Sequence, residues 1–226
     1  MKQVILCDFD GTITTGDVTD GLCHLYLPAL REDMRRLSDL WHEGKVSATE
    51  YSEYAYGAMN LSKSQVDTYL EQVEVSPGLG QLLSVASGGR WEFHILSSGY
   101  SYYIETTLAR LGLSLPYTAN SLGFGANDRV VVNHLANDDP TCSRYKHPCT
   151  GCKPVVWDEW KRRGYRVAFI GDGVSDYCVA ERFVTAAGPG DLLFATAGLR
   201  RYCEQHNIAA IPFETLADVA GVLARL

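Results

Sequence analysis

The sequence predicts an α/β fold, a doubly wound and mainly parallel sheet with helices packed on both of its faces. First, short apolar strands alternate with amphipathic helices along most of the 226 residues, which is the pattern of a parallel sheet. Second, several of the strands end in acidic or hydroxyl side chains, and the carboxyl ends of parallel strands are where ligands bind. Third, consecutive helices interrupt the alternation once, which predicts a small helical insertion after the first strand.

The first strand is expected over Gln3–Cys7, a continuous apolar run that suits a strand buried on both faces. Helical periodicity follows from Asp17 to Asn60. The segments Ser47–Glu50 and Ser62–Gln65 each match a capping box, in which a Ser and a Glu or Gln three residues later exchange hydrogen bonds at a helix start. Both segments therefore predict the beginning of a helix.

These features divide the chain into two predicted domains. The helical stretch 15–75 forms a cap, and residues 1–14 and 76–226 form the core domain, with Pro77 and Gly78 marking the return to it. The remaining core elements are expected as a helix (79–87), a strand (91–96), a helix (100–111), an antiparallel β-hairpin (116–134), a helix from Pro154, a strand (165–170), a short strand, a helix (192–206), a strand (208–212) and a final helix.

Composition excludes several classes of function. Hydrophobic residues make up 46% of the chain and charged residues 21%, as in ordinary globular proteins. A net charge of −7 argues against nucleic acid as a partner, because phosphate backbones are bound through clustered Lys and Arg. No apolar stretch approaches the ~20 residues of a membrane span, and no secretory signal is visible. We therefore expect a cytoplasmic protein that does not bind membranes; its oligomeric state is left open.

The most informative segment of the chain follows the first strand. Asp8 and Asp10 stand two residues apart, and Gly11 and Thr12 follow them in a predicted tight turn. Residues two apart along a strand point to the same face, so Asp8 and Asp10 are expected to act together on one small target. Two negative charges that close repel each other unless a cation lies between them or one keeps its proton. The pair therefore suits a nucleophile and a general acid beside a divalent metal, although a capped strand end is the simpler structural alternative.

Three later segments supply the other parts of such a site. Ser97 and the pair Asp172 and Asp176 each follow an apolar strand, and Lys153 stands at a predicted helix start. Together these groups suit phosphoryl transfer from a phosphomonoester. A carboxylate that attacks a phosphate dianion meets about 8 kcal/mol of repulsion, counted as two unit charges at about 4 Å and an effective dielectric constant of about 20. Mg²⁺ bound by Asp8 and Asp172, together with Lys153, would offset that repulsion.

The roles follow from the chemistry of each group. Asp8 is expected to form an aspartyl-phosphate, and Asp10 to protonate the leaving alkoxide and then activate the hydrolytic water. Ser97, with the backbone N–H groups of Ser98 and Gly11, is expected to hold the non-bridging phosphate oxygens. Ligands that are all oxygen atoms favour Mg²⁺ over zinc.

The same residues resemble the four motifs of the haloacid dehalogenase superfamily, in the family's order. Asp8-Phe-Asp-Gly-Thr-Ile-Thr resembles the first motif, Ser97 the second, Lys153 the third and Gly171-Asp-Gly-Val-Ser-Asp176 the fourth. The resemblance implies a phosphatase, because Asp10 occupies the acid/base position. It also implies that the side chains of Asp8 and Asp172 and the backbone carbonyl of Asp10 hold Mg²⁺, while Asp176 supports the metal's water shell or Lys153.

A narrower resemblance concerns the substrate, expected to be a small phosphorylated metabolite. The helical insertion resembles the cap of phosphoserine phosphatase-like members of the superfamily. The run Cys149-Thr-Gly-Cys152-Lys153-Pro154 and the C-terminal region resemble the methionine-salvage phosphatases of 2-hydroxy-3-keto-5-methylthiopentenyl-1-phosphate. Phosphoserine, phosphocholine and phosphoethanolamine are alternative substrates. A phosphotransferase or mutase, and a protein that binds a phosphate ligand without catalysis, are alternatives of other classes.

Several residues have two interpretations each. Thr12 either stabilises the turn or reaches the phosphate, and Asp17 is either a helix N-cap or a substrate ligand. A tyrosine among Tyr100, Tyr102 and Tyr103 either faces the substrate or packs in the core.

The cysteines near Lys153 also leave alternatives open. Cys142, Cys149 and Cys152, with His147 between them, have the residue types of a structural zinc site, but only one C-x₂-C pair is present. A disulfide or redox pair and plain reduced thiols are the other interpretations.

Overall fold

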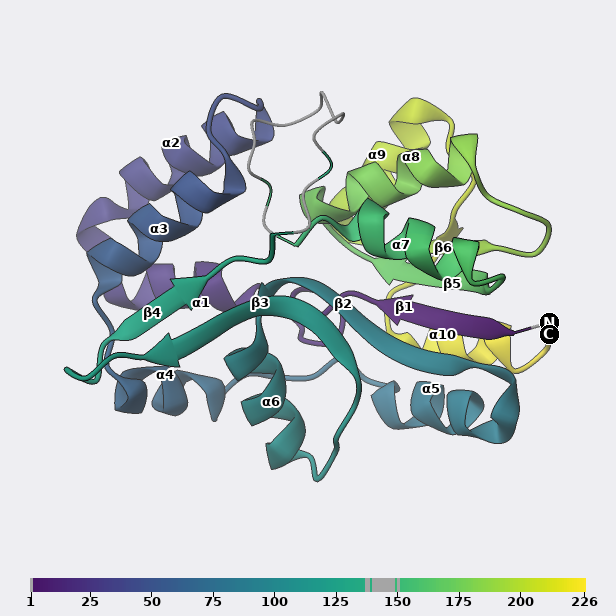
Figure 1. The fold of residues 1–226 in the computed structure, drawn as a ribbon, viewed down its shortest axis with the longest axis horizontal. Helices are drawn as coiled ribbons and strands as arrows, with labels where there is room; N and C mark the ends of the chain where they lie inside the picture. The colour runs from purple at the N-terminus through teal and green to yellow at the C-terminus, as the bar shows by residue number, and fades with distance from the viewer. Residues whose placement is uncertain (1, 137–138, 140–148, 150) are drawn as a thin grey trace.

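A seven-stranded sheet forms the centre of the computed structural model, which describes residues 2–136, 139, 149 and 151–226 (Figure 1). The sheet order is β4-β3-β2-β1-β5-β6-β7, and only the β3–β4 pair is antiparallel. The strands are β1 Gln3–Cys7, β2 Glu92–Tyr100, β3 Tyr117–Phe124, β4 Val130–Asn133, β5 Arg166–Gly171, β6 Leu192–Ala195 and β7 Ile211–Pro212. The predicted fold class and the predicted hairpin are both confirmed.

Helices cover both faces of this sheet, with α5, α6 and α10 on one face and α7, α8 and α9 on the other (Figure 1). The α-helices are α1 Val18–Tyr26, α2 Arg31–His42, α3 Ala48–Met59, α4 Lys63–Leu70, α5 Leu79–Val85, α6 Ser101–Arg110, α7 Lys153–Arg162, α8 Tyr177–Thr185, α9 Ala197–His206 and α10 Leu216–Leu223. Short 3₁₀ segments lie at Pro28–Leu30 and Val174–Asp176, and a π-helical turn at Ala86–Arg90.

Strand β1 occupies the middle of the sheet because its side chains are apolar on both faces. Val4 and Leu6 pack with the core under α7 to α9, whereas Ile5 and Cys7 pack with the core on the opposite face. All four side chains are fully buried. This alternation is what a strand with apolar residues at every position allows, and it fixes the position of the residue that follows, Asp8, in the interior.

The helical insertion consists of α1 to α4 and lies beyond the carboxyl end of β1, beside the β3–β4 hairpin (Figure 1). Both predicted capping boxes are confirmed: Ser47 with Glu50 begins α3, and Ser62 with Gln65 begins α4. The two segments that join the insertion to the sheet pair with each other, because Thr14 and Val75 form an antiparallel bridge. The division into a core (1–14 and 76–226) and a cap (15–75) stays a prediction.

One predicted element was placed wrongly. The helix expected over 192–206 begins only at Ala197, because Leu192–Ala195 forms strand β6 between β5 and β7. A short apolar run fits either a buried helix turn or a buried strand, and the neighbouring strands decide which one forms. Within the described part of the chain, no helix combines the length and apolar character needed to cross a membrane.

Candidate active site

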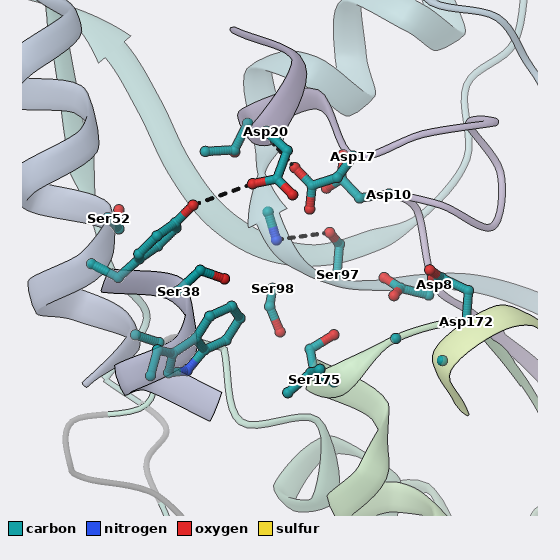
Figure 2. A pocket seen from close by; sticks show the side chains of 18 of the residues that line it. Asp8, Asp10, Asp17, Asp20, Ser38, Ser52, Ser97, Ser98, Asp172 and Ser175 are labelled. Atoms are coloured by element: carbon teal, nitrogen blue, oxygen red, sulfur yellow. Dashed lines mark hydrogen bonds between the residues drawn. The ribbon is translucent and has the colours of Figure 1, made fainter. Parts of the chain in front are cut away.

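The carboxyl ends of β1, β2 and β5 meet at one edge of the sheet and border a cavity of about 490 Å³ (Figure 2). Strand β1 lies between β2 and β5. The next three strands, β2 to β4, extend the sheet on one side of β1, and β5 to β7 extend it on the other. Such a reversal opens a crevice between the loops, where ligands bind in doubly wound folds. Asp8, Asp10, Ser97 and Asp172 all line this cavity, so the structure brings the predicted acidic and hydroxyl groups together.

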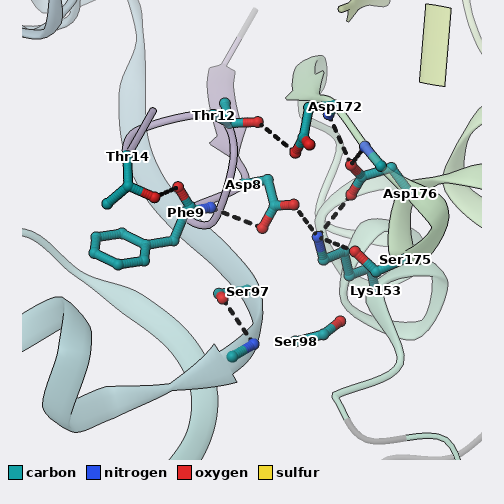
Figure 3. A network of polar contacts seen from close by, with 12 residues as sticks. Asp8, Phe9, Thr12, Thr14, Ser97, Ser98, Lys153, Asp172, Ser175 and Asp176 are labelled. Atoms are coloured by element: carbon teal, nitrogen blue, oxygen red, sulfur yellow. Dashed lines mark hydrogen bonds and ion pairs between the residues drawn. The ribbon is translucent and has the colours of Figure 1, made fainter. Parts of the chain in front are cut away.

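Asp8, Lys153 and Asp176 form a buried ion-pair network at the base of the site (Figure 3). The Lys153 Nζ lies 2.7 Å from Asp8 Oδ2 and 2.6 Å from Asp176 Oδ1. Lys153 also donates to the Ser175 hydroxyl at 3.0 Å. These contacts use three partners for the three ammonium protons, so the position of the ammonium group beside Asp8 is fixed.

Asp176 organises the loop after β5. Its Oδ2 accepts from the backbone N–H groups of Asp172, at 3.0 Å, and Gly173, at 3.1 Å, while its Oδ1 accepts from Lys153. Both oxygens of this fully buried carboxylate are therefore engaged by protein donors. Asp176 therefore fixes the position of the Asp172 backbone and of the Lys153 ammonium group, which lies beside Asp8.

The carboxylates of Asp8, Asp172 and Asp176 form a group whose oxygen atoms lie within 4.8 Å of one another, and it is the group that could hold a metal ion among the described residues. Three carboxylates and one ammonium leave this cluster with two excess negative charges when all four groups are ionised. A divalent cation with hard oxygen ligands balances that charge, and Mg²⁺ prefers such ligands. The residues present therefore fit Mg²⁺.

The pKa values of the cluster reflect the same charge imbalance. Burial raises the pKa of Asp8 well above its ordinary value, Asp176 raises it further, and Lys153 opposes both effects. Burial, followed by the charge of Asp176, raises the pKa of Asp172 to about 7. Burial alone would lower the pKa of Lys153, but Asp176 and Asp8 raise it above its ordinary value. Lys153 is therefore a cation at neutral pH, and the carboxylates need further positive charge to stay ionised.

Asp10 has a different environment from Asp8. The chain turns after Asp8, so Asp10 reaches the cavity from the turn rather than along the same strand face. Its Oδ1 accepts from the backbone N–H of Val18 at 2.9 Å, in the first turn of α1. Burial raises the pKa of Asp10 to about 6, although this hydrogen bond lowers it. Asp10 therefore titrates near neutral pH, as a residue that donates and accepts protons requires.

Glycines leave the space that the carboxylates occupy. A Cβ on Gly99 would lie 2.3 Å from Asp10 Oδ2, and a Cβ on Gly171 would lie 2.4 Å from Asp176 Oδ2. Gly11 has a φ of +71°, and a Cβ there would lie 2.3 Å from Asp172 Oδ2. Any larger residue at these positions would displace a charged group of the site.

Ser97 and Ser98 lie at the carboxyl end of β2, and both line the cavity (Figure 2). The Ser97 hydroxyl is buried and accepts from the Gly99 N–H at 2.9 Å, which fixes its rotamer. The fully buried Asn120 on β3 donates to the Ser98 carbonyl at 2.7 Å and accepts from the Leu135 N–H at 2.9 Å. Asn120 thus supports the serine turn from the neighbouring strand.

Three other predicted residues make contacts within the protein. Thr12 donates to Asp172 Oδ1 at 3.1 Å, and the Gly11 N–H donates to the Gly16 carbonyl at 3.3 Å. Asp17 is the N-cap of α1, with its Oδ1 accepting from the Asp20 N–H at 2.8 Å, and it also lines the cavity. Both interpretations of Asp17 are therefore compatible with its position.

Sequence reasoning missed part of this site. Ser175 and Asn120 lie in elements that were predicted, but nothing in the local pattern indicates their contacts with Lys153 and Ser98. The helical insertion also contributes lining residues that had not been singled out: Thr19, Asp20, Ser38, Trp41, Ala48, Tyr51, Ser52 and Tyr56. Tyr100 lines the cavity as well, whereas Tyr103 is buried. Among the predicted zinc ligands, Cys142 and His147 fall outside the described residues, so that site stays a prediction.

Comparison with known proteins assigns the fold and the family. A curated protein of Exiguobacterium sibiricum, named 2-hydroxy-3-keto-5-methylthiopentenyl-1-phosphate phosphatase, is 26% identical over 97% of this chain and 95% of its own length. One of the same name from Lysinibacillus sphaericus is 24% identical over 100% and 96%.

A solved structure of a substrate-bound phosphoserine phosphatase complex matches with a TM-score of 0.69 at 17% identity, covering 100% of this chain and 99% of that one. A phospho-aspartyl intermediate analogue of phosphoserine phosphatase matches with the same TM-score at 16% identity, covering 98% of both chains. The family model described as haloacid dehalogenase-like hydrolase matches residues 5–181, which include every acidic residue of the cluster. This chain belongs to the haloacid dehalogenase-like hydrolase family.

Proposed function

We propose that this protein is a Mg²⁺-dependent phosphomonoesterase that hydrolyses a small phosphorylated metabolite through an aspartyl-phosphate on Asp8. The observation that supports this most strongly is the pairing of two carboxylates with different environments. Asp8 lies 2.7 Å from the Lys153 ammonium, while Asp10 contacts a backbone N–H and has a pKa near 6. One is suited to attack phosphorus, and the other to transfer protons.

The reaction has two steps that use the same residues. In the first, an Asp8 oxygen forms a bond to phosphorus, the bond from phosphorus to the ester oxygen breaks, and the Asp10 carboxyl proton passes to the leaving alkoxide. In the second, the oxygen of a water molecule bonds to phosphorus while Asp10 accepts a proton from that water. The bond between phosphorus and Asp8 then breaks, and inorganic phosphate leaves.

The remaining groups bind and stabilise the phosphoryl group. When bound, Mg²⁺ neutralises charge on the phosphate; the side chains of Asp8 and Asp172 and the carbonyl of Asp10 would hold it, with Asp176 in support. Lys153 stabilises the charge on the transferring oxygens. Ser97 and Ser98 bind non-bridging oxygens.

Gly11, Thr12 and Asp17 have supporting roles in this proposal. Thr12 orients Asp172, Gly11 keeps space open beside it, and Asp17 lies where the leaving group enters. The core (1–14 and 76–226) supplies the chemistry, and the cap (15–75) supplies most of the contacts to the leaving group.

The names of the curated relatives supply the first substrate to test, 2-hydroxy-3-keto-5-methylthiopentenyl-1-phosphate of methionine salvage. Phosphoserine, phosphocholine and phosphoethanolamine complete the panel. We place the activity in the cytoplasm.

The test is phosphate release across this panel, in excess Mg²⁺ and in EDTA, with wild type beside Asp8→Asn. We expect strong release from one ester in Mg²⁺ and little in EDTA. Asp8→Asn should lower kcat by a factor of about 10³ or more, because the nucleophile is lost. Asp67→Asn, in an exposed ion pair on α4, is the matched control and should retain activity. Mass spectrometry of acid-quenched enzyme should find the phosphoryl group on Asp8.

Two results would contradict the proposal. If wild type and Asp8→Asn release the same small amount of phosphate in every metal tested, the protein is a binding protein rather than an enzyme. If an added alcohol receives the phosphoryl group faster than water does, the protein is a phosphotransferase.

Zinc measured in the same preparation would test a structural site at Cys142, Cys149 and Cys152, and less than one zinc for several chains would exclude it.

A further inference from the structure

Six hydroxyl-bearing residues line the part of the cavity that faces the helical insertion; Ser38 and Tyr51 are two of them, and the other four have hydroxyls that contact another hydroxyl. These four are Thr19 on α1, Ser52 and Tyr56 on α3, and Tyr100 at the end of β2. We call these four residues the hydroxyl wall. Because α1 and α3 lie beyond the phosphate-binding edge of the sheet, the hydroxyl wall is placed to contact the leaving group rather than the phosphate (Figure 1).

Two residues of the hydroxyl wall, Thr19 and Tyr56, are connected in a row of three hydroxyls that ends at Tyr103. Tyr56 Oη lies 2.9 Å from Thr19 Oγ1 and also contacts the hydroxyl of Tyr103, which is fully buried on α6. Burial raises the pKa of both tyrosines well above the ordinary value, so both keep their protons. The three hydroxyls have three protons and make two contacts with one another, so one proton remains for another acceptor.

The other two residues of the hydroxyl wall, Ser52 and Tyr100, form a triangle with His134. Ser52 Oγ contacts Tyr100 Oη and lies 3.1 Å from His134 Nε2, and Tyr100 Oη lies 3.3 Å from the same nitrogen. Burial lowers the pKa of His134, which keeps the ring neutral at pH 7. Each hydroxyl oxygen has two lone pairs, so Ser52 and Tyr100 retain accepting capacity after these contacts are made. The hydroxyl wall thus offers both donors and acceptors and no charge.

Two acidic residues lie beside this wall, Asp17 and Asp20, and each accepts a hydrogen bond from within the protein. Asp17 accepts from the Asp20 N–H, and Asp20 accepts from the Tyr51 hydroxyl at 3.2 Å (Figure 2). These contacts hold the start of α1 and tie it to α3. Arg201 on α9 also lines the cavity, so the charged groups of the lining are of both signs, and the hydroxyl wall is its uncharged part.

We propose that the hydroxyl wall binds hydroxyl or carbonyl oxygens of the leaving group, so that the preferred substrates are phosphomonoesters of neutral, oxygen-bearing short-chain alcohols rather than of amino alcohols. This inference rests on the proposed phosphomonoesterase function. It assigns Thr19, Ser52, Tyr56 and Tyr100 to substrate selection, and His134 and Tyr103 to positioning their hydroxyls.

The test compares esters that share a phosphate and differ in the leaving group. Glycerol 3-phosphate and 1-propyl phosphate have the same number of carbons and differ by two hydroxyls, and phosphoethanolamine adds a cation. We expect kcat/KM for glycerol 3-phosphate to exceed those for the other two by about tenfold or more, which is the ratio that one well-made hydrogen bond supplies. The Kd of each ester for Asp8→Asn in Mg²⁺, measured by calorimetry, should follow the same order without any turnover.

Tyr100→Phe and Ser52→Ala each remove one hydroxyl from the hydroxyl wall. We expect each to lower the ratio of kcat/KM for glycerol 3-phosphate to kcat/KM for 1-propyl phosphate by about tenfold, mostly through a higher KM for glycerol 3-phosphate. Tyr26→Phe is the matched control, because Tyr26 lies on α1 with its hydroxyl on the Gln65 carbonyl at 3.3 Å, outside the cavity lining. It should leave the ratio unchanged. A purely structural role would lower the activity on both esters equally.

The outcomes separate this inference from the proposed function. Equal kcat/KM for glycerol 3-phosphate and 1-propyl phosphate, or a preference for phosphoethanolamine, would overturn the hydroxyl wall as the selecting surface while leaving the phosphatase intact. No phosphate release from any ester, with the binding order preserved in Asp8→Asn, would overturn the phosphatase and keep the wall. If Tyr100→Phe does not fold, the wild-type preference and Ser52→Ala decide the question.

Discussion

The side chain of Asp10 holds the first turn of α1: its Oδ1 accepts from the Val18 N–H at 2.9 Å. Val18 is the first residue of α1 and follows the N-cap Asp17. The hydrogen bond favours the ionised form of Asp10, whereas burial favours the protonated form, and the balance raises its pKa to about 6. The protonation state of the proposed acid/base is thus coupled to the helical insertion through one backbone N–H.

Val18→Pro should raise the pKa of Asp10 further. Proline removes the N–H and is tolerated at the first position of a helix, and the backbone of Asp17 (φ −75°, ψ 125°) suits a residue that precedes proline. The pH–rate profile should show the limb near pH 6 shifted upward. Val18→Ala keeps the N–H and is the control. An unshifted limb in Val18→Pro would mean that this hydrogen bond does not tune Asp10.

Gly99→Ala should lower activity by about 10²-fold with little loss of stability, because a misplacement of about 1 Å in a reacting group costs that much. The new methyl group would lie 2.3 Å from Asp10 Oδ2 and 3.1 Å from Ser97 Oγ. Gly80→Ala, where nothing lies within 4 Å of the added carbon, is the control and should be fully active. Steady-state kinetics and thermal melts measure both effects. Full activity in Gly99→Ala would show that Asp10 can move without loss.

Lys153→Met should destabilise the protein by about 3–5 kcal/mol, because it leaves Asp8 and Asp176 buried without their cation. Urea denaturation measures the change, and low pH should reduce it as the carboxylates gain protons. Arg35→Met is the control: its partner Glu32 and Arg35 are both exposed, so the midpoint should barely change. Equal midpoints for the two variants would show that the buried network contributes no stability.

Without metal, the protein should lose stability as pH rises from about 4 to about 7. The pKa of Asp172 rises from 3.8 to about 7 on folding, so the folded state binds more protons than the unfolded state across that window. Mg²⁺ should therefore raise the Tm more at pH 8 than at pH 5, as measured by thermal melts in EDTA and in excess MgCl₂. Asp172→Asn should flatten the pH dependence and reduce the effect of Mg²⁺. A Tm in EDTA that rises with pH through this window would contradict the charge imbalance.

Much of the candidate active site could be predicted because its residues follow strands that the sequence marks clearly. Asp8, Ser97 and Asp172 each come directly after an apolar run, and parallel strands bring their carboxyl ends to one edge of the sheet. Lys153 was predicted from its helix start. The expectation that Asp10 shares a strand face with Asp8 was wrong in its detail, because β1 ends at Cys7 and a turn places Asp10.

The residues that shape the rest of the cavity could not be predicted in the same way. Ser52, Tyr100 and His134 are 34 to 82 positions apart in the chain, and no local pattern relates them. Gly99 has no unusual backbone angle to mark it, and its role becomes apparent only from the distance to Asp10.

The sequence by itself determined the fold class, the family and the charged groups of the centre, because these depend on local periodicity and on residues adjacent to strands. Only the tertiary structure decided which donors Asp10 and Asp176 use, which hydroxyls line the leaving-group side, and how burial separates the pKa values of the carboxylates. Those properties arise from groups that are distant in sequence and close in space, where desolvation and neighbouring charge act over a few ångströms.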